Sequence, residues 1–167
     1  MAFVAEDGTG LADANSLCDL EFADQYFTDR LTVAWVGSDL VKQGALVAAT
    51  DYVEGRWSAR FKGCRLTETQ ALSFPRTDID ADGSVPVGMK KAIAEYALRA
   101  LKGPLAPDVA PESNGLTLTA TKKKVGPIET EVRYNENRSA QLYRAYPSAD
   151  ALVRPFLRGT GRGVIRA

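Results

Sequence analysis

The chain has 167 residues and a mass of 18.0 kDa, with 45% hydrophobic and 25% charged residues, which is typical of one compact soluble domain. Its 21 Lys and Arg residues balance 21 Asp and Glu residues, so the total charge gives no reason to expect a polyanion-binding protein. The absence of histidine excludes a Ser-His-Asp triad, a Cys-His pair and imidazole metal ligands.

Cysteine content and hydropathy indicate the compartment. Cys18 and Cys64 are too few for a disulfide framework and form no Cys-x-x-Cys motif, so we expect reduced thiols that pack as small hydrophobic side chains. The N-terminal residues form no apolar signal segment. No stretch reaches the roughly 18 uninterrupted apolar residues of a membrane span. We therefore expect a protein that is made in the cytoplasm and has no membrane partner.

Charge is distributed unevenly along the chain. Residues 1–120 contain 11 basic and 17 acidic side chains, whereas residues 121–167 contain 10 basic and 4 acidic ones. This asymmetry suits a basic tail that binds nucleic acid, or a head-to-tail contact between copies of the chain. The alternative is an accident of composition.

Two helices are predicted after a loop-rich beginning. Residues 1–18, rich in Gly, Asp and Asn, indicate an extended arm. Asp19 can cap a first helix that runs to about Arg30, and Ser38 can cap a second one that continues to about Trp57. Small residues in the middle of the second helix would let another helix approach closely; they are Gly44, Ala45, Ala48 and Ala49.

The next part of the chain predicts a third helix between two connections. A short helical turn is expected at residues 67–72, before Pro75 enforces an extended exit. The third helix follows Pro86, where apolar residues recur at helical spacing, and Gly103 ends it. The Pro-rich residues 103–115 then indicate a rigid, polar connection that leaves the helices.

The remaining segments predict two strands and a last helix. The Thr-rich, β-branched residues 115–134 favour a β-hairpin with three lysines near its turn or edge. Ser148 can cap a short helix that Pro155 ends or kinks.

Together these elements predict a mainly α fold in a single domain, residues 1–167. Its parts are a small helical bundle, an inserted β-hairpin and extended N- and C-terminal arms. We place the bundle at about 19–103 and 147–157, the hairpin at about 115–134 and the C-terminal arm at 158–167.

The C-terminal arm is rich in glycine and arginine. Ordering it costs about 1–2 kcal/mol per residue and few apolar groups offset this cost, so we expect it to be disordered on its own. Val164 and Ile165 would suit strand addition to a partner or insertion into a groove, and the alternative is a frayed chain end. We favour a docking arm, whose candidate contact residues are Arg158, Arg162, Val164, Ile165 and Arg166.

One segment begins like a calcium loop, with Asp78, Asp80 and Asp82 followed by glycine. The pattern then fails, because Pro86 stands at its ninth position and Met89 at its twelfth, where glutamate is required. We favour an exposed turn over a weak calcium site. We expect no metal, no cofactor and no catalytic residue, so an enzyme is the least favoured class.

Nucleic acid has two candidate contacts, a lysine cluster and the arginines of the arm. About three phosphate contacts per chain would give weak, salt-dependent binding without sequence preference. A single-strand platform also needs aromatic rings among its basic residues. The cluster consists of Lys122, Lys123 and Lys124, and the neighbouring rings are those of Tyr134, Tyr143 and Tyr146.

Seven segments, taken in order, resemble those of tailed-bacteriophage neck proteins: VAEDGTGLADANS, LEFADQYF, ALVAATDYVEGRW, TQALSFPRT, VPVGMKKAIAEYALRAL, KKKVGPIETEV and YPSADALVRPFL. The likeness covers nearly the whole chain, and ATDYVEGRW followed by QALSFPRT is its most specific part. Such proteins are head-tail connector adaptors, often labelled DnaT-like single-stranded DNA-binding proteins.

The resemblance implies a structural virion protein, a helical adaptor that forms a ring of twelve subunits beneath the portal and continues the DNA channel in the neck. Residues 158–167 would dock on the portal, and the hairpin lysines would face the lumen or the next neck protein. The implied partners are other copies of the chain, the portal protein, downstream neck, stopper or tail proteins, and the packaged DNA. The alternative function is that of a DnaT-like single-stranded DNA-binding protein.

Overall fold

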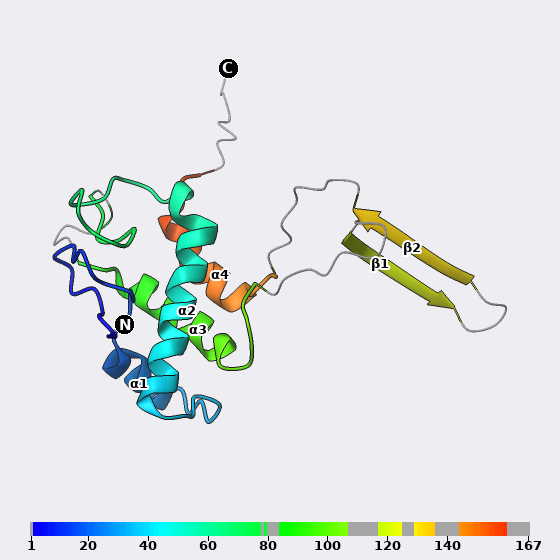
Figure 1. Ribbon diagram of the computed structural model, residues 1–167, viewed down its shortest axis with the longest axis horizontal. Coiled ribbons are helices and arrows are strands. Elements are labelled where there is room, and N and C mark those ends of the chain that lie inside the picture. The colour runs from blue at the N-terminus through cyan, green and yellow to red at the C-terminus, as the bar shows by residue number, and fades with distance from the viewer. Residues whose placement is uncertain are drawn as a thin grey trace, which may run out of the picture. The chain divides into compact units, whose positions relative to one another are not determined.

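Figure 1 shows the computed structural model, which describes residues 2–77, 79, 84–106, 117–124, 129–135 and 144–159. The chain divides into two compact units. We call Met1–Leu105 with Ala145–Ala167 the helical unit, and Ala106–Arg144 the insertion. The described elements are mostly helices, which confirms the predicted mainly α fold. In this part of the chain no helix has both the length and the apolar content needed to cross a bilayer.

Helix α1 (Leu20–Thr28) begins where the sequence predicts. The carboxylate of Asp19 accepts a hydrogen bond from the backbone N–H of Phe22 at 2.7 Å, an N-cap that contributes roughly 1 kcal/mol. Helical spacing brings three side chains to one buried face, namely Ala23, Tyr26 and Phe27.

Helix α2 (Asp39–Trp57) is the longest described helix. Ser38 occupies its N-cap position, as predicted, but the serine side chain makes no cap hydrogen bond. Among the small residues in its middle, Ala45 and Ala49 are buried, whereas Gly44 and Ala48 are exposed. One small-residue side of α2 therefore packs inside the helical unit and another stays open.

The described residues between α2 and the next helix form no α-helix. They begin with the 3-10 turn η1 (Ser58–Arg60) and continue through bends and isolated bridges. The helical turn predicted at 67–72 is wrong. The buried side chain of Gln70 accepts a hydrogen bond from N of Thr67 and donates one to O of Leu72, so it replaces hydrogen bonds that a helical backbone would have made.

Helix α3 (Val87–Ala100) begins directly after Pro86, and Gly103 with φ of 144° ends the turn that follows it, as predicted. This helix packs along α2. Its buried residues include Met89, Ile93 and Tyr96, all three with no exposed area.

Helix α4 (Pro147–Val153) packs against α3 and passes into the 3-10 turn η2 (Arg154–Phe156). The predicted cap, Ser148, is wrong, because Tyr146 occupies the N-cap position and the helix begins at Pro147, two residues earlier than predicted. Proline is favoured at a first helical position, where its fixed φ suits the helix and its missing N–H is not needed.

The N-terminal residues do not form the extended arm that the sequence predicts. Leu17 has no exposed area and Glu6 is buried. The Glu6 carboxylate accepts hydrogen bonds from the backbone N–H groups of Gly8, Gly10 and Leu11, each at 2.9 Å. One charged group thus orders the glycine-rich loop against the helices.

The insertion contains two antiparallel strands, β1 (Thr117–Lys124) and β2 (Glu129–Asn135). Lys124 pairs with Glu129 in the register of the two strands. The predicted β-hairpin stays a prediction, because its turn at 125–128 and both connections to the helical unit lie outside the described residues.

Candidate binding surfaces

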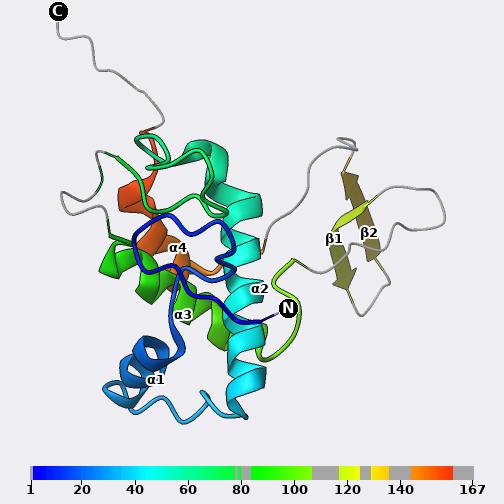
Figure 2. The ribbon, with the colours of Figure 1, turned by 60° about the vertical axis from the view of Figure 1, so that its left-hand side comes forward.

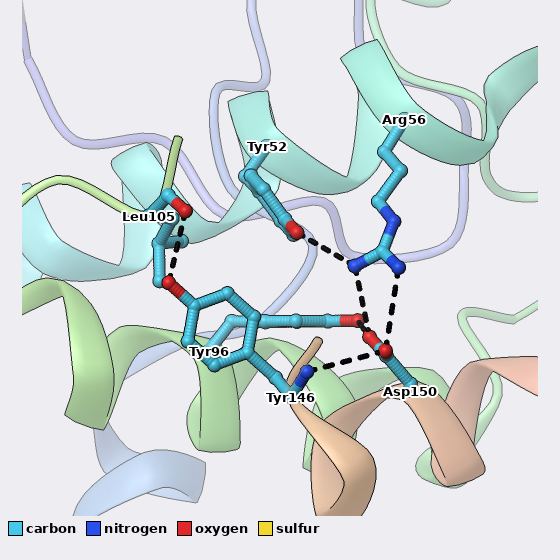
Figure 3. A network of polar contacts seen from close by, with 6 residues as sticks. All are labelled: Tyr52, Arg56, Tyr96, Leu105, Tyr146 and Asp150. Atoms are coloured by element: carbon cyan, nitrogen blue, oxygen red, sulfur yellow. Dashed lines mark hydrogen bonds and ion pairs between the residues drawn. The ribbon is translucent and has the colours of Figure 1, made fainter. Parts of the chain in front are cut away.

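A buried polar network joins α2, α3 and α4 (Figure 3). Asp150 accepts hydrogen bonds from the guanidinium of Arg56 at 3.1 and 3.3 Å and another from the hydroxyl of Tyr96. Arg56 also donates to the hydroxyl of Tyr52 at 2.6 Å. The side chains of Arg56 and Asp150 are each 14% exposed, so this ion pair is largely shielded from water.

Tyr146 extends this network to the base of the insertion. Its hydroxyl donates to the carbonyl of Leu105 at 2.9 Å, and its backbone N–H donates to Asp150 at 3.3 Å. Leu105 is the last residue before the insertion and Ala145 the first one after it. The chain therefore leaves the helical unit and returns to it at one place.

The Tyr96 hydroxyl keeps its proton and can therefore donate its hydrogen bond to Asp150. Burial raises the pKa of its phenol above the usual value, and the hydrogen bond to Asp150 acts in the same direction. The hydroxyl therefore stays a donor, as the Asp150 carboxylate requires.

One end of α2 carries an apolar surface. Figures 1 and 2 show α1 and the segment that leads to α2 at this end. Five of the seven large hydrophobic side chains that are exposed in the described chain belong to this segment and the first turn of α2. We call them the apolar end: Leu31 (86% exposed), Val33 (88%), Val36 (67%), Leu40 (78%) and Val41 (53%).

An open cleft of about 380 Å³ includes part of the apolar end. Its inner wall is fixed by Asp24, one oxygen of which accepts hydrogen bonds from Trp35 Nε1 at 2.6 Å and Lys42 Nζ at 2.8 Å. Leu31 on its rim has a φ of 51°, in the left-handed region that favours glycine. The fold thus exposes the side chain of Leu31 and keeps its backbone in a conformation that is unfavourable for leucine.

The opposite end of α2 carries a basic surface that sequence reasoning missed. Phe61 and Leu157, both buried, pair in an antiparallel bridge. Within it, N of Arg158 donates to O of Arg60 at 2.8 Å. Side chains alternate along extended chain, so the residues next to the buried pair lie in solvent. We call the exposed cations here the basic end: Arg60, Lys62, Arg65, Arg154 and Arg158.

The sequence contains only part of the signal for the basic end. Residues 56–65 hold four basic side chains and no acidic one, which is a visible cluster. The residues that complete it, Arg154 and Arg158, lie about ninety positions or more away. Only the bridge between Phe61 and Leu157 brings the two groups together.

The predicted arm and lysine cluster are described only in part. Of the arm, Arg158 lies in the basic end, whereas Arg162, Val164, Ile165 and Arg166 lie outside the described residues. The predicted lysines are in β1, whose side chains are not described; they are Lys122, Lys123 and Lys124.

The two cysteines and the calcium-like segment are the remaining residues that the sequence singles out. Cys18 is buried, and burial raises the pKa of its thiol, as suits a small hydrophobic side chain; Cys64 is exposed. Asp78, Asp80 and Asp82 lie outside the described residues. Within the described ranges, no group of three or more His, Cys, Asp or Glu side chains could hold a metal ion.

These features define a small, mainly α protein with an apolar end, a basic end and an insertion anchored at one place. A family model described as "Putative DnaT-like ssDNA binding protein" matches residues 1–167, so the chain belongs to this family. The match confirms the DnaT-like label, and the connector part of the resemblance stays a prediction. No curated protein and no solved structure matches the chain.

Proposed function

We propose that this chain is a non-catalytic assembly protein, a head-tail connector that forms a ring under the portal of a tailed bacteriophage and continues the DNA channel in the neck. The observation that carries the proposal is the apolar end. Contiguous exposed apolar surface marks a site of protein interaction, and its burial contributes about 25 cal/mol per Å². We propose a neighbouring copy of the chain as its partner.

The geometry of a ring determines the kind of contact between neighbouring subunits. Each interface in it is heterologous, so the apolar end of one subunit meets a different surface of the next. In this proposal residues 158–167 dock on the portal, and many weakly binding arms together gain avidity. Downstream neck, stopper or tail proteins bind the other side, DNA passes through the lumen, and the protein resides in the virion neck after synthesis in the host cytoplasm.

Leu31→Gly tests the proposal without damage to the fold. It removes an apolar side chain that is 86% exposed, at a φ of 51° that glycine adopts readily. We expect the free energy of unfolding to stay the same or to rise by up to about 1 kcal/mol. We expect the variant to form no ring on the portal protein, as measured by size-exclusion chromatography with light scattering, because its subunits no longer bind one another and a single arm binds the portal weakly.

Val87→Gln is the matched control, since Val87 is 57% exposed but begins α3, away from the apolar end. This variant should assemble like the unchanged chain. Deletion of 158–167 should abolish portal binding and leave the helical unit folded. Assembly by Leu31→Gly at normal affinity would refute the role of the apolar end.

A second candidate is single-stranded DNA binding, which the family description favours. Among aromatic side chains whose exposure the structure describes, none is exposed, and only Phe3, Phe22 and Phe156 are half-buried. Base stacking would therefore fall to Tyr134 or Tyr143, which belong to the insertion, as the lysine cluster does.

Replacement of Lys122, Lys123 and Lys124 by alanine tests this candidate. If it is right, affinity for a fluorescent oligothymidine, measured by anisotropy, falls steeply with salt and is lost in the triple variant. Loss of DNA binding with unchanged assembly on the portal would make DNA binding the leading function.

A further inference from the structure

We propose that the basic end binds the phosphate backbone of nucleic acid, and that it binds single-stranded and duplex DNA with similar affinity. Of these five residues only Arg158 has an assigned role, as the first residue of the arm that docks on the portal, and neither proposed function assigns a site to the other four. The inference goes beyond both, because binding at this surface requires neither a ring nor the lysines of β1.

The cations of the basic end are available to a ligand. The ion pairs of the described chain are made by other residues, namely Lys42, Arg56, Lys90 and Arg99. Lys62 and Arg65 donate only to backbone carbonyls, those of Pro155 at 2.8 Å and Gln70 at 3.5 Å, which leave the positive charge uncompensated. Within the described ranges the guanidinium groups of Arg60, Arg154 and Arg158 make no hydrogen bond or ion pair.

The backbone fixes the spacing of these cations. N of Lys62 donates to O of Phe156 at 2.9 Å, in addition to the bond between Arg158 and Arg60. The guanidinium of Arg60 lies 5.1 Å from the ring centre of Trp57. A surface whose charges are positioned beforehand loses less conformational entropy when it binds.

Arg76 adds a buried positive charge to this end. Its guanidinium donates to three carbonyls, those of Lys62, Gly63 and Ser73, and pairs with no carboxylate in the described chain. Burial lowers the pKa of the Arg76 guanidinium; the charges of Arg158 and Arg65 act in the same direction, and the charge of Glu54 opposes them. Desolvated positive charge of this kind raises the local potential toward an anion.

The composition favours phosphate over protein carboxylates. Four of the five cations are arginines, whose planar fork matches a phosphate group with two hydrogen bonds. Residues 154–167 contain four arginines and no acidic residue, so the sequence continues the same chemistry. A nucleic acid presents a charge at every nucleotide and can engage both segments at once.

The absence of exposed aromatic side chains in the described part of the helical unit indicates whether the basic end distinguishes single-stranded from duplex DNA. Preference for single strands comes from stacking of unpaired bases on aromatic side chains. The helical unit exposes none within the described ranges, so we expect the basic end to recognise phosphates rather than stacked bases. Phosphates are common to both forms of DNA, and binding should depend on salt rather than on strandedness.

The test uses the full chain with Arg60→Gln, Arg65→Gln and Arg158→Gln combined. The matched control removes three positive charges elsewhere, at Arg30, Lys91 and Lys102, also by glutamine. Anisotropy is measured with a labelled 20-nucleotide strand and the corresponding 20-base-pair duplex between 50 and 200 mM salt. Circular dichroism establishes that each variant is folded.

We expect the unchanged chain to bind both DNAs with affinities within about threefold, since their phosphates are shared. The basic-end variant should bind at least tenfold more weakly, with a log-log salt slope reduced by about 2–3. The control, and the alanine variant of the β1 lysines, should retain binding.

Three results would overturn the inference: unchanged binding by the basic-end variant, a strong preference of the chain for the single strand, or no binding of either DNA at 50 mM salt. Binding of polyglutamate in place of DNA would assign the surface to an acidic protein partner instead.

Discussion

At the scale of single residues, Asp150 connects three parts of the helical unit that are distant in the sequence or lie on different helices. It binds Arg56, which is 94 positions away in the chain, and it also accepts hydrogen bonds from Tyr96 and from the backbone of Tyr146. A partly buried charge pair of this kind stabilises the fold mainly because removal of one partner leaves the other charge desolvated. The sequence alone presents Asp150 as an acidic residue in the first turn of a short helix.

Asp150→Ala should lower the free energy of unfolding by about 2–4 kcal/mol, because it takes the carboxylate from a shielded arginine and a buried phenol. Urea denaturation followed by circular dichroism measures this change. Asp51→Ala is the control, since Asp51 is exposed on α2 and makes no hydrogen bond or ion pair in the described chain. Its effect should stay within about 0.5 kcal/mol. Equal losses in both variants would contradict the role of Asp150.

At the scale of the elements, α2 lies between two regions of opposite charge. One is acidic and includes the apolar end, and the other is basic and includes part of the basic end. Its 19 residues span about 28 Å at 1.5 Å per residue. Residues 19–41, which include the apolar end, hold five acidic and one basic side chain, whereas residues 56–77 hold five basic and one acidic. Acidic and basic ends within one short helical unit suit contacts with two different partners.

Gly44→Ala should stabilise the chain by about 0.5–1 kcal/mol, because glycine in a helix interior loses more backbone entropy on folding than alanine. An added Cβ at Gly44 meets no atom within 4 Å. Gly103→Ala is the matched control: its Cβ also meets nothing, but the φ of 144° is one that alanine rarely adopts, so we expect destabilisation. Thermal denaturation compares the two. A fall in stability for Gly44→Ala would show that α2 is not a regular helix there.

At the scale of the whole molecule, the chain combines a helical unit with an insertion that leaves and re-enters this unit at neighbouring residues. Tyr146 and Leu105 are joined by a hydrogen bond, and among the side chains whose burial the structure describes, the largest fully buried ones belong to the helical unit. Closure of a short loop between two such ends costs little entropy. The helical unit therefore has the core and the connections of an independently stable fold.

A chain in which residues 106–144 are replaced by a short Gly-Ser linker should keep its helical circular dichroism and unfold cooperatively. Tyr146→Phe in this shortened chain removes the bond to Leu105 and should cost about 1 kcal/mol. Non-cooperative unfolding of the shortened chain would mean that the helical unit depends on the insertion.

The sequence was sufficient wherever a structural signal is local. The Asp19 cap, the end of α3 near Gly103 and the span of α2 each depend on residues within about one turn, and each prediction agrees with the structure. The predictions failed where a distant or buried side chain replaced the local pattern. The Glu6 carboxylate orders the N-terminal loop that was expected to be an extended arm, and the Gln70 side chain makes hydrogen bonds where a helical turn was expected.

The sequence by itself determined the helical class, the positions of the three longer helices and the exclusion of histidine chemistry, because composition and periodicity are properties of neighbouring residues. Only the tertiary structure decided which charges gather. The net acidic residues 1–120 contain most of a basic surface, since the bridge between Phe61 and Leu157 brings Arg60 and Arg158 together. Coulomb interactions depend on distance in space, and a linear count of charges does not contain that distance.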